Sequence, residues 1–248
     1  MGNSRNVAVV GDGDLRRTYY SHSLFPIPYT MLTLVIGNKN YSSWSLRPYL
    51  VLKHFGIAFD EVRILLDTPH FQQDVARWAP NRRVPALHDD GLVVWDSLAI
   101  CEYVNERYLD GRGWPADVAA RAHARSAAAE MHSGFMALRK QLPMNMRRTP
   151  DAYRWDAAAD ADIARIQAMW RELRTQHGMG GPFLCGKFSI VDAMFAPVVS
   201  RFLSYGVAMD ANAQAFADAI QGLDAWRGWR AAGEAEEEYL EDTERFRA

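Results

Sequence analysis

The sequence has few cysteines, little net charge and no long apolar run. Two of its 248 residues, Cys101 and Cys185, are cysteines, too few and too far apart for a disulfide framework or a metal site. The net charge of −2 argues against a nucleic-acid-binding protein, because such proteins are typically basic. No apolar run approaches the roughly 18 residues of a membrane span, and residues 1–30 lack the apolar core of a signal peptide. We expect a cytoplasmic protein without a metal, a nucleic-acid partner or a membrane anchor.

The pattern of apolar residues divides the chain into successive parts. Residues 1–30 show no sustained period and are expected to form an extension outside the fold. Residues 31–110 mix strand-like and helix-like segments, whereas residues 117–248 are almost wholly helical in pattern. Between them, residues 111–116 are rich in turn-forming residues and predict a linker. The chain is long enough for one large domain or two ordinary ones.

The first domain is predicted to be a small α/β domain. Residues 32–36 are almost continuously apolar, as in a strand buried on both faces, and residues 62–66 alternate as a second strand would. Residues 84–88 and 92–95 flank an aspartate–glycine turn and predict a β-hairpin. Strands linked by helices pair in parallel and hairpin strands pair antiparallel. The sequence therefore predicts a mixed four-stranded sheet with helices, followed by an all-α domain.

Ser42 and Ser43 lie at the turn between the first predicted strand and the first predicted helix, whose apolar residues begin at Leu46. A helix start offers unpaired backbone N–H groups and a positive dipole end. An anion or a developing thiolate would therefore be stabilised beside these hydroxyls. One serine could also be only the N-cap of the helix.

Two further turns could bind a ligand. Proline at a strand entrance, as at Val84–Pro85, often marks a cis bond, which would leave the Val84 backbone able to pair with an extended ligand. An ordinary trans proline at a sheet edge is the alternative. Asp96 and Ser97 begin another helix, where a carboxylate beside free N–H groups suits a ligand with both an α-amino and an α-carboxylate group. A simple N-cap is again the alternative.

These features together resemble the glutathione transferase family. The matching motifs follow the order of that family: residues 42–47 (SSWSLR), 83–87 (RVPAL), 96–97 (DS) and 183–193 (FLCGKFSIVDA). The resemblance implies a thioredoxin-like amino-terminal domain, an all-helical second domain, a homodimer and a detoxifying transferase with glutathione as co-substrate. The serine-type first motif looks most like the zeta and theta-like bacterial branches. Trp44 stands where zeta enzymes have a cysteine, and Asp96 where the family usually has glutamate.

The resemblance also implies roles for single residues. Ser42 would donate a hydrogen bond to the glutathione sulfur, with Ser43 as its neighbour or substitute. Arg83 and Val84 would hold the cysteinyl backbone of glutathione, and Pro85 would be the cis proline. Asp96 and Ser97 would bind the γ-glutamyl end.

A pocket for the second substrate is expected between the domains, past a long helix. That helix would carry His132, Phe135, Met136 and Arg139, which suit an apolar pocket with a rim that tolerates an anion. Phe135 could instead pack into the core, and Arg139 could lie on a solvated face.

The implied function is activation of the glutathione thiol for attack on, or isomerisation of, a small electrophile. A free thiol has a pKa near 8.5, so a site that favours the thiolate accelerates such chemistry at neutral pH. Isomerisation of maleylacetoacetate, as in zeta enzymes, is one alternative. A non-catalytic binding or scaffold module is the other, because fold does not fix function.

Overall fold

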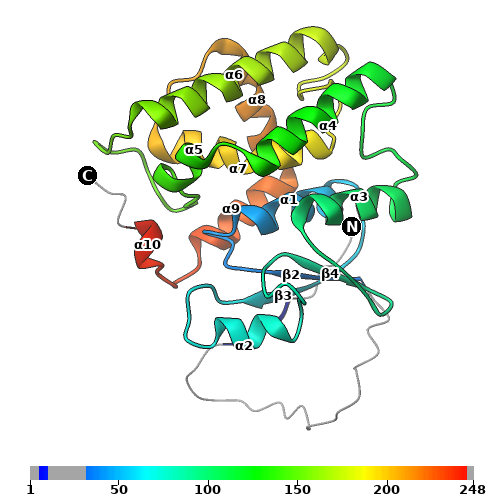
Figure 1. Ribbon diagram of the computed structural model, residues 1–248, viewed down its shortest axis with the longest axis vertical. Coiled ribbons are helices and arrows are strands. Elements are labelled where there is room, and N and C mark those ends of the chain that lie inside the picture. Colours follow the sequence, from blue (N-terminus) through cyan, green and yellow to red (C-terminus); the bar gives the residue numbers. More distant parts are fainter. Residues whose placement is uncertain (1–5, 11–31, 245–248) are drawn as a thin grey trace.

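A computed structural model describes residues 6–10 and 32–244 of the chain (Figure 1). Its strands form one sheet in the order β1-β3-β2-β4-β5. The strands are β1 (Asn6–Val10), β2 (Thr33–Ile36), β3 (Asp60–Ile64), β4 (Ala86–Asp89) and β5 (Leu92–Val94). β2 is parallel to β3 and antiparallel to β4, and β4 and β5 form an antiparallel hairpin. The predicted mixed sheet of four strands is thus confirmed, with β1 added beside β3.

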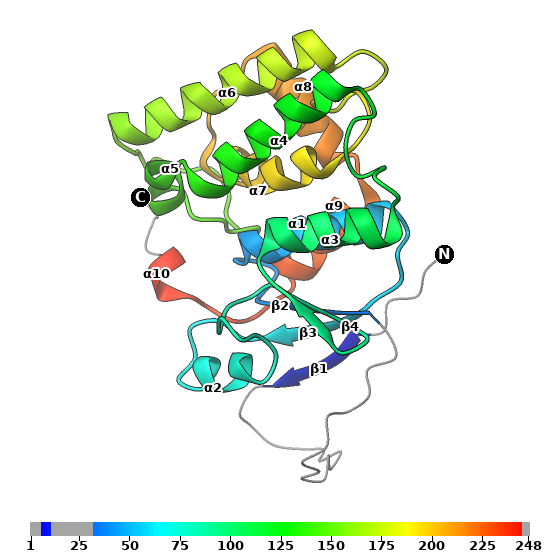
Figure 2. The same ribbon diagram turned by 45° about the vertical axis from the view of Figure 1, so that its right-hand side comes forward.

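Helices cover both faces of the sheet. α1 (Ser43–His54) and α3 (Ser97–Tyr108) lie between the sheet and the helical part of the chain, and α2 (Phe71–Ala76) lies on the opposite face (Figures 1 and 2). α1 follows β2 directly, and α3 follows β5. The starts of α1 and α3, where the sequence places candidate site residues, therefore belong to helices on the same face of the sheet.

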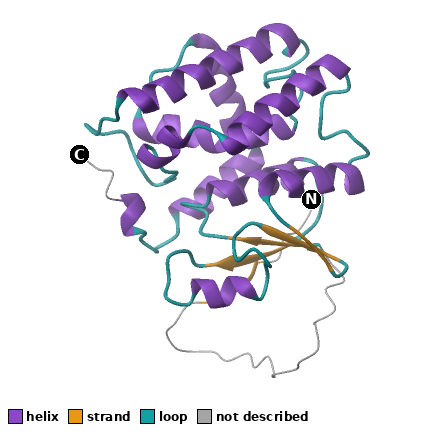
Figure 3. Ribbon diagram, in the orientation of Figure 1, coloured by secondary structure: helices purple, strands orange, loops and turns teal. Residues whose placement is uncertain are grey.

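The rest of the described chain is helical, which confirms the predicted all-α part (Figure 3). Its helices are α4 (Val118–Ser133), α5 (Met136–Gln141), α6 (Ala157–His177), α7 (Ile190–Tyr205), α8 (Ala211–Gln221), α9 (Asp224–Glu234) and α10 (Glu241–Glu244). Within the part of the chain that the structure describes, no helix is both long and apolar enough to cross a membrane.

The expectation that residues 1–30 lie outside the fold is wrong for Asn6–Val10. This segment is strand β1, which pairs in parallel with β3, with Asn6 opposite Glu61 and Val10 opposite Ile64. A parallel edge strand satisfies backbone groups of β3 that would otherwise face solvent. The remainder of residues 1–30 lies outside the described residues.

The prediction that one long helix carries the pocket residues is also wrong, because the helix is interrupted at Gly134. α4 ends at Ser133, and Gly134 is extended, with φ −106° and ψ −166°. A Cβ on Gly134 would lie 2.8 Å from the backbone oxygen of Glu130, so a larger residue would clash there. Phe135 then adopts a left-handed conformation with φ 61° before α5 begins at Met136. The break changes the direction in which the residues after it point.

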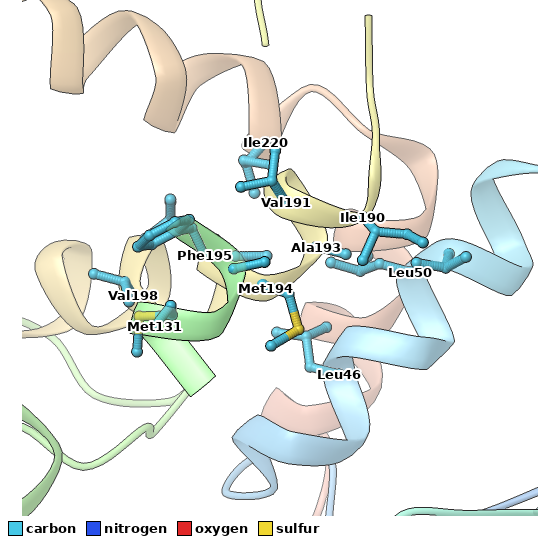
Figure 4. Close-up of a cluster of buried hydrophobic side chains, with 14 of the residues drawn as sticks. Leu46, Leu50, Met131, Ile190, Val191, Ala193, Met194, Phe195, Val198 and Ile220 are labelled. Carbon is cyan, nitrogen blue, oxygen red and sulfur yellow. The ribbon is translucent and has the colours of Figure 1, made fainter. Parts of the chain in front are cut away.

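The main hydrophobic core is continuous from the sheet half to the helical half. Leu46 and Leu50 of α1 face Ile190, Ala193 and Met194 of α7 (Figure 4). All of these side chains are fully buried. α1 is therefore held between the sheet and α7, which fixes the direction of its amino-terminal end.

A buried carboxylate fixes the start of α7. Asp192 accepts hydrogen bonds from the backbone N–H groups of Ser189 (2.7 Å) and Leu184 (2.9 Å), and it forms a capping box with Ser189. Burial raises the pKa of Asp192 to about 7, and the hydrogen bonds oppose that shift. The capping box sets the start of the helix that carries Arg201 toward the Ser43 turn.

Candidate functional site

The Ser42 hydroxyl lies at the start of α1 without capping it. Ser42 is the N-cap residue, but its side chain accepts no bond from the helix backbone. Its Oγ lies 2.7 Å from the Oγ of Ser45, which in turn accepts the N–H of Gly37 at 3.2 Å. If Ser45 donates its proton to Ser42, the proton of Ser42 stays free for a ligand, and the chain of hydrogen bonds strengthens it as a donor.

Ser43 receives a hydrogen bond from the opposite half of the protein. The Nη2 of Arg201 on α7 donates to the Ser43 Oγ at 3.3 Å, and its Nε donates to the backbone oxygen of Leu142 at 2.8 Å. Burial and the nearby charge of Arg139 lower the pKa of Arg201 to about 9, so the guanidinium still carries its charge at neutral pH. The Ser43 hydroxyl thus accepts from a cation and keeps its own proton for donation.

Two arginines and a histidine contact Trp44, the residue that follows the two serines. The guanidinium carbons of Arg47 and Arg139 lie 4.4 and 4.9 Å from the centre of the Trp44 rings, and the His132 ring meets it edge to face at 5.2 Å. Among the described residues, the Nε and Nη2 of Arg47 are buried without a hydrogen-bond partner. Burial is the largest cause that lowers the pKa of Arg47, and the charges of Arg139 and Arg201 add to it, so that the pKa is about 9. The start of α1 is therefore strongly positive and favours a bound anion.

The start of α3 is linked to the same cluster. One oxygen of Asp96 accepts the N–H groups of Leu98 (3.0 Å) and Ala99 (3.2 Å), so Asp96 is the N-cap of α3. Its other oxygen lies 2.8 Å from the Nε2 of His132. Burial lowers the pKa of His132, and Asp96 opposes that shift.

Ser97 lies deeper than Asp96. It is fully buried, and its Oγ accepts a hydrogen bond from the Nη1 of Arg47 at 3.3 Å. Arg47 therefore stacks on Trp44 at one helix start and reaches Ser97 at the other. The two candidate turns form one continuous site.

The bond between Val84 and Pro85 is cis, as predicted. Pro85 is buried, Val84 is half-buried and Arg83 is exposed. The backbone N–H of Arg83 donates to the Oδ1 of Asn81 at 3.2 Å. The bond between Trp95 and Asp96 is cis as well, and no sequence pattern predicted it.

The residues expected to line the second-substrate pocket do not stay together. His132 and Arg139 lie against Trp44, whereas Phe135 is buried in the main core, as its alternative interpretation held. Met136 is 67% exposed. Arg139 is not on a solvated face, because its Nε donates to the backbone oxygen of Gly134 at 2.9 Å and its Nη2 to that of Met131.

Arg201 contacts the candidate site at Ser43, and the sequence analysis did not single it out. A charged residue in the mostly apolar second half of α7 was the available signal, because a buried arginine needs partners. Among the described residues, no group of three or more histidine, cysteine, aspartate or glutamate side chains could hold a metal ion.

Two family models match the chain. The description "Glutathione S-transferase, N-terminal domain" matches residues 41–107, and "Glutathione S-transferase, C-terminal domain" matches residues 156–232. Together they cover more than half of the chain. They include the Ser42 turn, the cis proline, the Asp96 turn and α7.

Curated relatives match part of the chain. Glutathione S-transferase GstB of Escherichia coli is 28% identical over 130 residues, which is 52% of this chain and 62% of the relative. A probable maleylacetoacetate isomerase of Caenorhabditis elegans is 33% identical over 100 residues, 40% of this chain and 46% of the relative. The chain thus matches less than two thirds of the length of either relative.

Solved structures share most of the fold. A glutathione transferase homolog from Burkholderia with bound glutathione superposes with a TM-score of 0.64 at 23% identity, over 83% of this chain and 100% of that one. At this identity the similarity shows the fold alone. The motifs, the fold and the two family models agree, and the chain belongs to the glutathione S-transferase family.

Proposed function

We propose that the protein is a glutathione transferase in which Ser42 stabilises the glutathione thiolate. The single observation that carries this proposal is the Ser42 hydroxyl, which sits at the start of α1, makes no cap bond and lies in a turn bordered by buried arginines. A ligand sulfur at this turn would meet a hydroxyl donor and a positive helix end together.

The chemistry follows from the pKa of the thiol. A free thiol near pKa 8.5 is mostly protonated at pH 7, and only the thiolate attacks efficiently. The positive start of α1 and the Ser42 hydroxyl favour loss of the thiol proton to solvent. The sulfur lone pair then forms a bond to an electrophilic carbon, and a leaving group departs with its electron pair or a double bond is rearranged. Arg201 would support the same charge through Ser43.

The remaining glutathione contacts are proposed at the other two turns. Arg83 and Val84, next to cis Pro85, would hold the cysteinyl backbone, and Asp96 with Ser97 would hold the γ-glutamyl end. Support comes from the link through Arg47, which joins Ser97 to the Trp44 ring beside the serines. We also propose that residues 31–110, with strand β1 added to their sheet, and residues 117–248 are the two domains, joined by residues 111–116.

Isomerisation is the second candidate reaction. The Caenorhabditis elegans relative is named as a probable maleylacetoacetate isomerase, which favours a thiolate that adds to a carbon–carbon double bond and then leaves. Arg139 beside Trp44 would provide positive charge for an acidic substrate. The bulk of Trp44, in place of the zeta cysteine, would restrict this space.

Retention on immobilised glutathione tests the proposal first. The thiol of glutathione in the complex is then titrated by its thiolate absorbance. A screen of aryl halides, peroxides and maleylacetoacetate analogues as second substrates follows. A thiol pKa well below 8.5 with turnover of any of these supports the enzyme. Binding without a thiol shift or turnover would instead favour a scaffold module, and no binding would remove glutathione as the co-substrate.

Asp96→Asn and Ser97→Ala should each weaken glutathione binding more than they slow turnover at saturating glutathione. These residues would contact the end of glutathione far from the sulfur, so they contribute equally to ground-state and transition-state binding. Ser97→Ala should also cost about 1–3 kcal/mol of stability, because Arg47 loses its remaining buried acceptor. Glu106→Gln, exposed on the same helix, is the matched control. Unchanged affinity in both variants would remove this turn from the site.

A homodimer is proposed by analogy with the family. Sedimentation at micromolar concentration should give about twice the 28.1 kDa of one chain. A sedimenting mass of one chain would contradict the proposal.

We also propose a detoxifying role in the cytoplasm. Cys101 and Cys185 are both free thiols, which suits a reducing compartment. Fractionation of cells that express the tagged full-length chain would test the location.

A further inference from the structure

The turn before Ser42 is bound by residues from the far end of the described chain. We call residues 38–41 the active-site turn and residues 233–244 the acidic strap. The backbone N–H groups of Lys39 and Asn40 donate to the two carboxylate oxygens of Glu236, at 2.7 and 3.0 Å. The backbone oxygen of Lys39 accepts from the Nε1 of Trp229 at 2.8 Å. Consecutive backbone groups of the turn are thus satisfied by partners almost 200 positions away in the sequence.

Glu236 is built into this contact. It is 8% exposed, and Arg63 of β3 donates to its Oε1 at 2.8 Å, so its charge is balanced by the sheet. Hydrogen bonds from N–H groups to an ionised carboxylate are stronger than neutral ones. Glu236 therefore ties the active-site turn to β3 through one side chain.

A second contact holds the end of the turn. The Tyr41 hydroxyl donates to the Oε1 of Glu244 at 2.7 Å, and Glu244 is 2% exposed. Arg147 also donates to the Tyr41 hydroxyl, and its backbone N–H donates to the Oδ1 of Asn40 at 3.0 Å. Side chains at both ends of the strap thus bind the active-site turn.

The approach of the strap to the turn is close. A Cβ on Gly233 would lie 3.0 Å from the backbone nitrogen of Asn40 and 3.0 Å from the carbonyl carbon of Lys39. A side chain at position 233 would therefore require the strap or the turn to shift by a few tenths of an ångström. The turn has little room to move while the strap is in place.

The active-site turn in turn sets the position of Ser42. The N–H of Ser42 donates to the backbone oxygen of Asn38 at 2.8 Å, and that of Ser43 to the oxygen of Tyr41 at 2.9 Å. We propose that Glu236 is a positioning residue: through Lys39 and Asn40 the acidic strap holds the Ser42 hydroxyl and the first N–H groups of α1 in the geometry that stabilises the thiolate. This inference rests on the proposed function for its chemical readout, but the contact itself can be tested without glutathione.

Glu236→Gln tests the inference. The variant replaces one accepting oxygen by an NH₂ group, which cannot accept from the turn and repels a neighbouring donor. The pKa of bound glutathione should rise, and kcat at pH 7 should fall by roughly tenfold to hundredfold, since displacements of about 1 Å have effects of this size. The KM for glutathione should change less than twofold, because the γ-glutamyl contacts lie elsewhere. Activity should recover partly at higher pH, and Glu236→Asp should restore part of it.

Glu237→Gln is the matched control. It removes the same charge from the position next to Glu236, where the side chain is exposed. This variant should keep the wild-type thiol pKa and kcat. A Glu236→Gln protein that melts earlier but keeps both values would overturn the inference and leave glutathione activation intact.

Amide hydrogen exchange separates this inference from the proposed function. In the unliganded protein, Glu236→Gln should speed exchange at Lys39 and Asn40 at least tenfold, while Leu50 inside α1 stays protected. Unchanged exchange would overturn the inference even if wild-type protein proved not to bind glutathione. Should Glu236→Gln not fold, Tyr41→Phe provides the second test, because it removes only the hydroxyl, which bonds to Glu244, to Arg147 and to the strap backbone at Glu238 and Leu240. It should raise the thiol pKa in the same direction, and an unchanged pKa would count against the strap.

Discussion

Replacing Ser42 by alanine should raise the pKa of bound glutathione by roughly 1–2 units and lower turnover at pH 7 by roughly tenfold to hundredfold. A hydrogen bond to a charged group is worth about 1.5–3 kcal/mol, and one pKa unit corresponds to about 1.4 kcal/mol. The helix start and the buried arginines remain, so a residual rate should survive and recover as the pH rises. Thiolate absorbance at varied pH gives the pKa, and steady-state kinetics at saturating glutathione gives the rate.

Ser43→Ala and Ser45→Ala are the matched controls. Both are buried serines in the same turn region, but Ser43 bonds to Arg201 and Ser45 bonds to Ser42. We expect a smaller pKa increase for Ser45→Ala, because it removes only the partner that orients Ser42, and a smaller one still for Ser43→Ala. If Ser43→Ala raises the thiol pKa and Ser42→Ala does not, the sulfur lies at Ser43. If neither substitution does, the helix end and the arginines carry the activation.

Replacing Trp170 by alanine should destabilise the protein by about 3–5 kcal/mol, as for other large buried side chains. Trp170 on α6 is fully buried, with ring centres 5.8, 5.4 and 4.8 Å from those of Phe195, Phe202 and Phe216. The cavity would open where α6, α7 and α8 meet. The melting temperature should fall by roughly 6–20 °C for a chain of this length.

Two controls define the cause of that loss. Among the described residues the Trp170 Nε1 has no hydrogen-bond partner, so Trp170→Phe loses volume but no bond and should cost clearly less. Met179→Ala changes a side chain that is 94% exposed and should stay within about 0.5 kcal/mol of wild type. Urea denaturation gives the free energies of unfolding. A cost of less than about 1 kcal/mol for Trp170→Ala would contradict the packing described for this cluster.

The parts of the fold predicted correctly are those with a local sequence pattern. The apolar strand before Ser42 and the hairpin around Asp90 and Gly91 both depend on residues within a few positions of one another. The cis bond at Pro85 also has a local cause, because only proline makes such bonds common.

The parts that were missed or wrong depend on distant contacts. Asn6–Val10 becomes a strand only by pairing with β3, and the break at Gly134 follows from its close approach to Glu130 together with the core that takes in Phe135. The candidate site shows the same limit. Its serines were visible in the sequence, but Arg201 reaches Ser43 from 158 positions away, and Glu236 reaches Asn40, in the turn before Ser42, from 196 positions away. No periodicity within a short window can reveal such a pair.

Because α1 packs between the sheet and α7, we do not expect the amino-terminal half to be stable without the helical half. Leu46 and Leu50, which face α7 (Figure 4), would become exposed if the helical half were removed. Ser43 would also lose its contact with Arg201. The isolated amino-terminal half would therefore expose apolar surface next to an incomplete site, and such surface promotes aggregation. Chimeric proteins made with related chains should fold only when α1 and α7 come from the same parent. The two helices therefore have to be exchanged as a pair.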